Sequence, residues 1–138
     1  MIRILIGIFL IAHGLVHSGL AAAPIPNDSN SKPGAFFTDP TRSWLLSRIG
    51  LNTSAIRITG IVLVALATLS FITAGLGILG VFGLESIWRA MTVVSAGLSL
   101  LLLVVFWHPW LFVGVLLNIG ILIALLWLHW PSPKLIGS

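Results

Sequence analysis

Residues 3–23, RILIGIFLIAHGLVHSGLAAA, form one long apolar run that carries two histidines. A hydrocarbon core about 30 Å thick is crossed by a helix of roughly 20 apolar residues, and three more runs of that length lie at 57–81, 88–107 and 110–130. Charged residues make up only 7% of the 138 residues, whereas soluble domains average about 25%. The sequence therefore predicts an all-α polytopic protein, a four-transmembrane-helix bundle that forms a single domain over 1–138 and crosses a plasma or inner cell membrane.

The rest of the composition narrows the possible functions. Cysteine is absent, which excludes disulfides, Cys-ligated zinc or iron–sulfur clusters, and thiol redox catalysis. Seven Lys and Arg against three Asp and Glu give a formal charge of +4. The basic residues are spread along the chain without a cluster, so we interpret them as membrane-flanking charges and expect no nucleic-acid partner. The lipid bilayer is the expected partner, together with another membrane protein or further copies of this chain.

The N-terminal run also imitates a secretory signal peptide, with Ala21 and Ala23 as a cleavage site. However, the run is longer than the usual apolar region of a signal peptide and is interrupted by His13 and His17. We therefore expect an uncleaved first membrane helix.

The connection 24–56 is predicted to be one long loop that contains a short interfacial helix. Its first part is rich in Pro, Asn, Ser and Gly, which favour loops. Asp39 can cap a helix that starts at Pro40 and ends at Gly50. The half-polar indole of Trp44 suits the headgroup boundary, although a loop helix packed on the mouth of the bundle is the alternative.

Tryptophans and basic residues predict the topology. The tight connection FWHPW at 106–110 implies an antiparallel hairpin, and an even number of helices places both termini on one membrane face. Arg3 precedes the first segment to insert, which favours cytoplasmic termini. The predicted interfacial anchors are Trp44, Trp107 and Trp110 on the long-loop side, and Trp88, Trp127 and Trp130 on the side of the termini.

The histidines share one face of the first helix with small residues. At 100° per residue, Gly7, His13, Gly14, His17 and Ser18 fall within an arc of about 140°. Ionisable side chains in membranes turn toward protein or a wet cavity, and small residues let helices approach. Both histidines are therefore expected to point into the bundle.

The other helices carry polar side chains at a matching depth. With a rise of about 1.5 Å per residue, His13, Ser70, Ser99 and Asn118 lie near the midpoints of their spans, and His17 lies about 6 Å nearer the long loop. Interhelical hydrogen bonds of this kind contribute on the order of 0.6 kcal/mol each. The sequence thus predicts a mid-membrane polar layer that sets helix register in an accessory, scaffold or binding subunit. No catalytic residue is predicted.

Two other functions stay open at this point. His13 and His17, four residues apart, can chelate one metal ion or contribute to a haem site, with His108 as a third ligand. No cofactor is expected in the preferred interpretation, and no Asp or Glu lies within the predicted membrane spans to support such a site. Small-solute transport is the second alternative, although intramembrane carboxylates and inverted repeats are both missing from the sequence. A nucleophile pair of His13 with Ser99 or Ser70 has no support from the flanking residues.

The stretches LIGIFLIAHGLVHSGL, RSWLLSRIG and SLLLLVVFW, with an Asn in the last helix, resemble small four-helix bacterial membrane proteins that are uncharacterised. The distinctive motif is His-Gly-x-x-His, formed by His13, Gly14 and His17. The His-Gly pair and the four-helix plan also resemble DoxX-like membrane proteins. That resemblance implies association with membrane redox enzymes.

Overall fold

The computed structural model describes residues 1–25, 27–30 and 36–136, and the predicted loop residues 26 and 31–35 lie outside this part. All regular elements of the described chain are helical, and four helices are long and apolar enough to cross a membrane. The predicted fold class is therefore confirmed. The four spans are α1 (Ile2–Ala22), α3 (Thr53–Leu79), α4 (Trp88–Val105) and a composite helix Pro109–Trp127 made of η2 (Pro109–Leu111), α5 (Phe112–Leu122) and the π-helical η3 (Ile123–Trp127).

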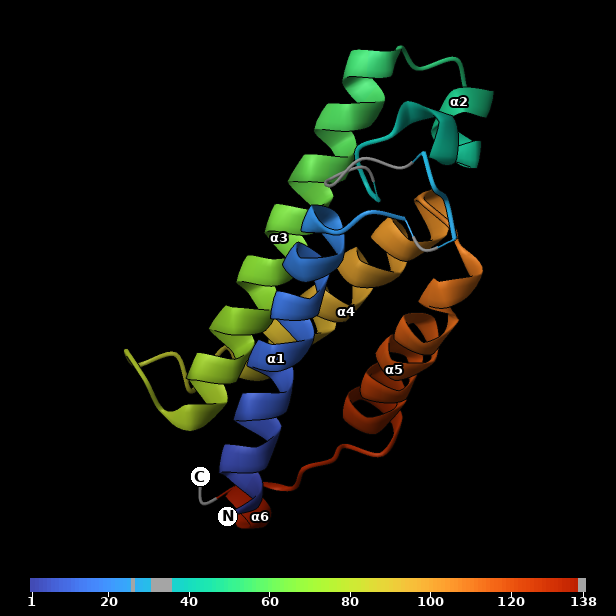
Figure 1. Cartoon of the computed structure of the whole chain (residues 1–138). Coiled ribbons are helices and arrows are strands. Elements are labelled where there is room, and N and C mark those ends of the chain that lie inside the picture. Colours follow the sequence, from blue (N-terminus) through green and yellow to red (C-terminus); the bar gives the residue numbers. More distant parts are fainter. Residues whose placement is uncertain (26, 31–35, 137–138) are drawn as a thin grey trace.

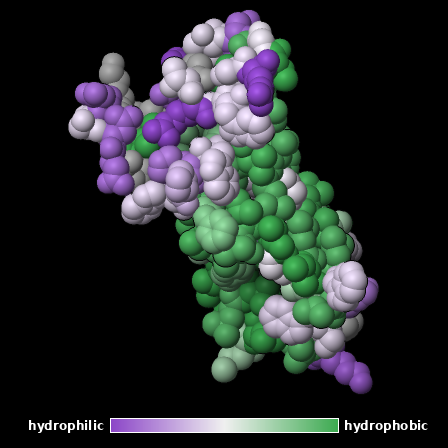
Figure 2. Space-filling model, turned by 90° about the vertical axis from the view of Figure 1, so that its right-hand side faces the viewer, coloured by the Kyte–Doolittle hydropathy of each residue, from purple (hydrophilic) through white to green (hydrophobic). Residues whose placement is uncertain are grey.

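The four spans run alternately up and down, and both termini lie at the same end (Figure 1). The main packing follows the chain, with α1 on α3, α3 on α4 and α4 on α5. The central helix is α3: 56% of the residues in its apolar 18-residue window are buried, against only 17% in that of the last span. The bundle is consequently more open around α5 than around α3. Apolar side chains cover most of the face shown in Figure 2, and the hydrophilic side chains gather mainly at its upper end, with a smaller group at its lower end.

Glycines allow α1 and α3 to pack closely. A Cβ atom added to Gly7 would lie 3.1 Å from the carbonyl oxygen of Gly75, and one added to Gly75 would lie 2.8 Å from the carbonyl oxygen of Gly7. A Cβ atom at Gly14 would lie 3.0 Å from the carbonyl oxygen of Thr68. The glycine face of α1 is therefore the face on which α3 packs, as small residues between membrane helices permit.

The second span begins one turn earlier than residue 57, its predicted start. The side chain of Asn52 accepts a hydrogen bond of 2.8 Å from the backbone N–H of Ala55 and caps α3 at Thr53. Helix α3 ends at Leu79, because Gly80 takes the left-handed conformation with φ +82°. Arg57 therefore belongs to the helix and does not flank it.

The short helix in the long connection consists of two pieces. Asp39 accepts a hydrogen bond of 2.9 Å from the backbone N–H of Thr41 and caps the 3-10 turn η1 (Pro40–Arg42). The side chain of Ser43 then caps α2 (Trp44–Arg48). A second capping residue inside the predicted helix explains the division. Gly50 follows α2 with φ +80°, the conformation predicted for its end.

Helix α2 is bonded to the end of α4. The Ser43 hydroxyl donates to the carbonyl oxygen of Val105 at 3.1 Å, and the Trp44 indole N–H donates to that of Val104 at 2.7 Å. These bonds satisfy two of the carbonyl groups that every helix leaves free at its C-terminus. The short helix thus packs on the mouth of the bundle.

The last span ends at Trp127 and not at residue 130 as predicted. A π turn closes it, with a hydrogen bond of 3.0 Å from the Leu128 N–H to the Ile123 carbonyl. Helical backbone is disfavoured before a proline, and Trp130 precedes Pro131. The chain turns at His129, which has φ +51°, and continues to α6 (Pro133–Ile136), which packs against α1.

Candidate functional site

A deeply buried polar contact joins α1 to α4. Ser99 is 0% exposed and His17 only 3% exposed. The Nδ1 atom of His17 lies 3.0 Å from the carbonyl oxygen of His13, so Nδ1 carries the hydrogen. A neutral imidazole has only one such hydrogen. The Ser99 hydroxyl therefore donates to Nε2 of His17, across an Oγ to Nε2 distance of 2.6 Å.

Asn118 connects this pair to α5. Its side chain is 0% exposed. Its Nδ2 atom donates to Oγ of Ser99 at 2.7 Å and to the carbonyl oxygen of Gly114 at 2.7 Å. Ser99 consequently accepts from Asn118 while it donates to His17, so one hydroxyl links three helices.

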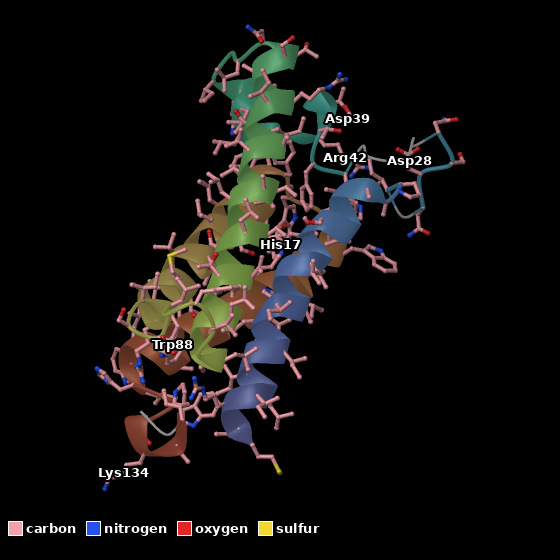
Figure 3. The ribbon with its side chains drawn as sticks, turned by 90° about the vertical axis from the view of Figure 1, so that its left-hand side faces the viewer. His17, Asp28, Asp39, Arg42, Trp88 and Lys134 are labelled. Carbon is pink, nitrogen blue, oxygen red and sulfur yellow. The ribbon has the colours of Figure 1, made fainter. Side chains whose placement is uncertain are left out.

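His13 of α1 is hydrogen-bonded to Asn118. Its Nε2 atom lies 3.4 Å from Oδ1 of Asn118, an oxygen that can only accept. Hydrogen bonds thus run from His13 to Asn118, from Asn118 to Ser99, from Ser99 to His17, and from His17 to the His13 carbonyl. We call these four residues the polar network. Figure 3 shows His17 near mid-height of the molecule, in the upper part of α1.

The ring of Phe71 packs against both histidines from α3. Phe71 is 0% exposed, and its ring centroid lies 4.8 Å from that of His13 and 5.9 Å from that of His17. Helix α3 therefore contributes an apolar contact to the polar network. In the described part of the chain, each buried side-chain nitrogen and oxygen has a hydrogen-bond partner.

Ser70, which was predicted to join this layer, bonds to its own helix. Its hydroxyl donates to the carbonyl oxygen of Leu66. The polar link from α3 to α1 comes from Thr68, which donates to the Gly14 carbonyl at 3.2 Å and lies 3.0 Å from the hydroxyl of Ser18. Sequence reasoning missed Thr68. The available signal was its position near mid-span, on the side of α3 that also carries Phe71.

The structure does not bring the proposed metal ligands together. His13 and His17 lie close, with ring centroids 5.3 Å apart. His108 instead contacts Phe36 at the loop end of the bundle, with ring centroids 5.6 Å apart. Among the described residues, no group of three or more His, Asp or Glu side chains has a geometry that could hold a metal ion. The haem or metal alternative stays a prediction.

His108 has a separate structural role. Its Nδ1 atom accepts a hydrogen bond of 3.2 Å from the backbone N–H of Trp110 and caps η2. It lines a polar pocket of about 480 Å³ with Asp28 and Arg42, whose side chains lie 3.9 Å apart as an ion pair. Burial and the nearby positive charge of Arg42 lower the pKa of His108 below its ordinary value.

The predicted anchors occupy different surroundings. Trp88 is only 6% exposed. Trp44 is 50% exposed, although its indole N–H bonds to α4. Large parts of the remaining four tryptophans are exposed as well, as expected for residues at a membrane surface: Trp107, Trp110, Trp127 and Trp130.

The chain matches no protein-family model, no curated protein and no solved structure. Its class is therefore defined by the fold itself. Four long apolar helices with lipid-compatible surfaces make it a multi-pass integral membrane protein.

Proposed function

We propose that this chain is a non-enzymatic accessory or scaffold subunit of a membrane complex, in which the polar network holds the helices in one arrangement. The observation that supports this proposal is the complete pairing of the network. Ser99 and Asn118 are 0% exposed, and each of them bonds to a neighbouring helix. A polar group that is paired in this way fixes the register of the helices without any ligand.

The same geometry disfavours the alternatives. Both Nε2 atoms of the histidines face network partners, so a metal ion would have to displace Asn118 and Ser99. The Ser99 and His17 pair has the form of a nucleophile with its base. However, a fully buried hydroxyl that also accepts from Asn118 offers a substrate no access.

The helix most available for a partner is α5. Its large side chains on several sides are exposed, including Phe112, Val113 and Leu116, each more than half exposed. We infer that another integral membrane protein or a second copy packs there. The resemblance to DoxX-like proteins would make a membrane redox enzyme one such partner.

The proposal can be tested with two serines on α4. Ser95 and Ser99 are both 0% exposed and lie one turn apart, but Ser95 bonds to the Met91 carbonyl of its own helix. Ser99→Ala leaves two buried partners unpaired and should reduce the free energy of unfolding by about 1–3 kcal/mol. Ser95→Ala, the matched control, should cost less than about 1 kcal/mol, because a Ser bond to its own helix adds little.

The measurement is thermal unfolding of the purified protein in detergent, together with its absorption spectrum, its metal content and its labelling by a fluorophosphonate serine probe. We expect a colourless, metal-free protein that the probe does not label. A haem band or a stoichiometric metal that is lost in His17→Ala would overturn the proposal. Labelling that is lost in Ser99→Ala but retained in Ser95→Ala would equally overturn it in favour of an enzyme.

A further inference from the structure

An apolar groove lies between α1 and the last span, on the side of the termini. Its volume is about 270 Å³, and its lining includes Ile2 and Leu10 from α1, Trp88 from α4, and Ile121 and Ala124 from the last span. Helices α1 and α5 make little direct contact along their length. The hydrogen bond from His13 to Asn118 joins them just beyond Leu10 and Ile121. The groove is therefore the part of the α1–α5 boundary that the polar network leaves open.

The groove spans the depth of one lipid leaflet. Ile2 and Leu10, at its two ends, are eight residues apart, or about 12 Å along a helix. One leaflet contributes about 15 Å to the hydrocarbon core. Figure 3 shows Trp88 below His17, between His17 and the end that carries Lys134. The groove thus begins at the membrane boundary and ends near mid-membrane, under the polar network.

Water is a poor occupant of this groove, because a buried water needs two to four polar partners. Among the groove side chains, the Thr92 hydroxyl already donates to the Trp88 carbonyl at 2.7 Å. A transmembrane helix about 10 Å wide would lie across the mouth of a groove of about 270 Å³ and leave it unfilled. A single hydrocarbon chain matches the apolar lining of the groove.

The open end of the groove is positively charged. Arg89 donates to the carbonyl oxygen of Pro131, which lines the groove, and its guanidinium carbon lies 5.1 Å from the ring centre of Trp88. Lys134 lies exposed at the same end, whereas Arg3 is directed at α3, where it donates to the carbonyl oxygen of Ile78. Basic side chains at a membrane surface attract anionic headgroups. We propose that the groove binds one acyl chain of an anionic phospholipid, whose phosphate lies beside Arg89 and Lys134.

The test uses native mass spectrometry of the detergent-solubilised full chain with added phosphatidylglycerol or phosphatidylcholine of identical acyl chains. We expect one retained phosphatidylglycerol per chain. Ala124→Phe places a ring in the groove and should reduce retention roughly tenfold. Ala12→Phe, on the exposed side of the same bundle, should leave retention unchanged. Lys134→Gln should lower the preference for phosphatidylglycerol over phosphatidylcholine about fivefold. This is the effect expected from the loss of one basic residue near an anionic headgroup.

Equal retention in wild type and Ala124→Phe would overturn the proposal, as would equal retention of the two lipids. A change of oligomeric state in Ala124→Phe without loss of lipid would assign the groove to a second copy. These outcomes are independent of the proposed scaffold role, because the groove variants leave Ser99 and Asn118 intact. Thermal unfolding of Ala124→Phe should remain cooperative, which separates a filled groove from a misfolded chain.

Discussion

Ser99 is the side chain on which the polar network depends most. Its hydroxyl both donates and accepts, so it connects His17 of α1 with Asn118 of α5 from a position on α4. In lipid, the helices gain little from burying apolar surface against each other, and directional bonds therefore decide which helices become neighbours. A single hydroxyl at mid-membrane can thus determine the arrangement of three helices.

His108 provides a pH-dependent contribution to stability at the loop end of the bundle. Burial and Arg42 lower its pKa in the folded protein below the ordinary value of 6.5. The unfolded chain then binds more protons as the pH falls through 6.5, so this contribution is present above that pH and is lost below it. In the neutral side chain, Nδ1 accepts a hydrogen bond from the Trp110 N–H. Protonation places a hydrogen on Nδ1 and therefore removes this acceptor.

We therefore expect the midpoint of thermal unfolding in detergent to fall between pH 7.5 and pH 5.5, and to fall less in His108→Asn. Asparagine is a suitable control because it retains an N-cap acceptor but does not titrate in this range. An identical pH dependence in both proteins would contradict this role of His108.

At the scale of the elements, α3 contacts neighbours on two sides. Gly14 and Gly75 bring it against α1, and a Cβ atom at Gly60 would lie 1.7 Å from the carbonyl oxygen of Phe37 in the long connection. Both contacts involve backbone atoms that cannot move aside as a flexible side chain would. Close packing around α3 therefore depends on positions where a single methyl group is too large.

Gly14→Ala should separate α1 from α3 and reduce the free energy of unfolding by about 1–3 kcal/mol, the usual cost of overpacking. Gly19 lies on the same helix with no atom within 4 Å of its added Cβ. Gly19→Ala should therefore be neutral or slightly stabilising, because alanine favours helices. Thermal unfolding of both variants measures the difference, and equal stability would show that α1 and α3 can separate at little cost.

At the scale of the whole molecule, the alternating spans place Ser29 at one end and Ser86 at the other. The chain has no native cysteine, so single cysteines introduced there report membrane sides without background. Because Arg3 lies in the first turn of α1, we expect the termini to be cytoplasmic.

In intact cells, a membrane-impermeant maleimide should then label Ser29→Cys, and it should label Ser86→Cys only after permeabilisation. The reverse pattern would place the termini outside. Labelling of both positions from the same side would contradict the fold, in which one span, α3, separates them.

Much of the arrangement of the spans and their polar side chains can be predicted from the sequence, because it depends on features within single helices. Run length specifies the spans. Helical periodicity directs the histidines of the first helix into the bundle, and the fixed rise per residue places Ser99 and Asn118 near the depth of His13, with His17 about 6 Å nearer the long loop. The rotation of α3 about its own axis could not be predicted from the sequence. Its two buried sides give no single apolar direction, so periodicity alone could not decide between Ser70 and Thr68 as the residue facing α1.

By itself, then, the sequence determined the number of spans, the common end of the termini and the inward face of α1, since each depends on composition or spacing along one helix. Only the tertiary structure decided which donor meets which acceptor, where α2 packs and where the groove remains open. The physical reason is distance. A hydrogen bond requires about 3 Å between specific atoms, and that separation is set by how whole helices tilt and rotate against one another.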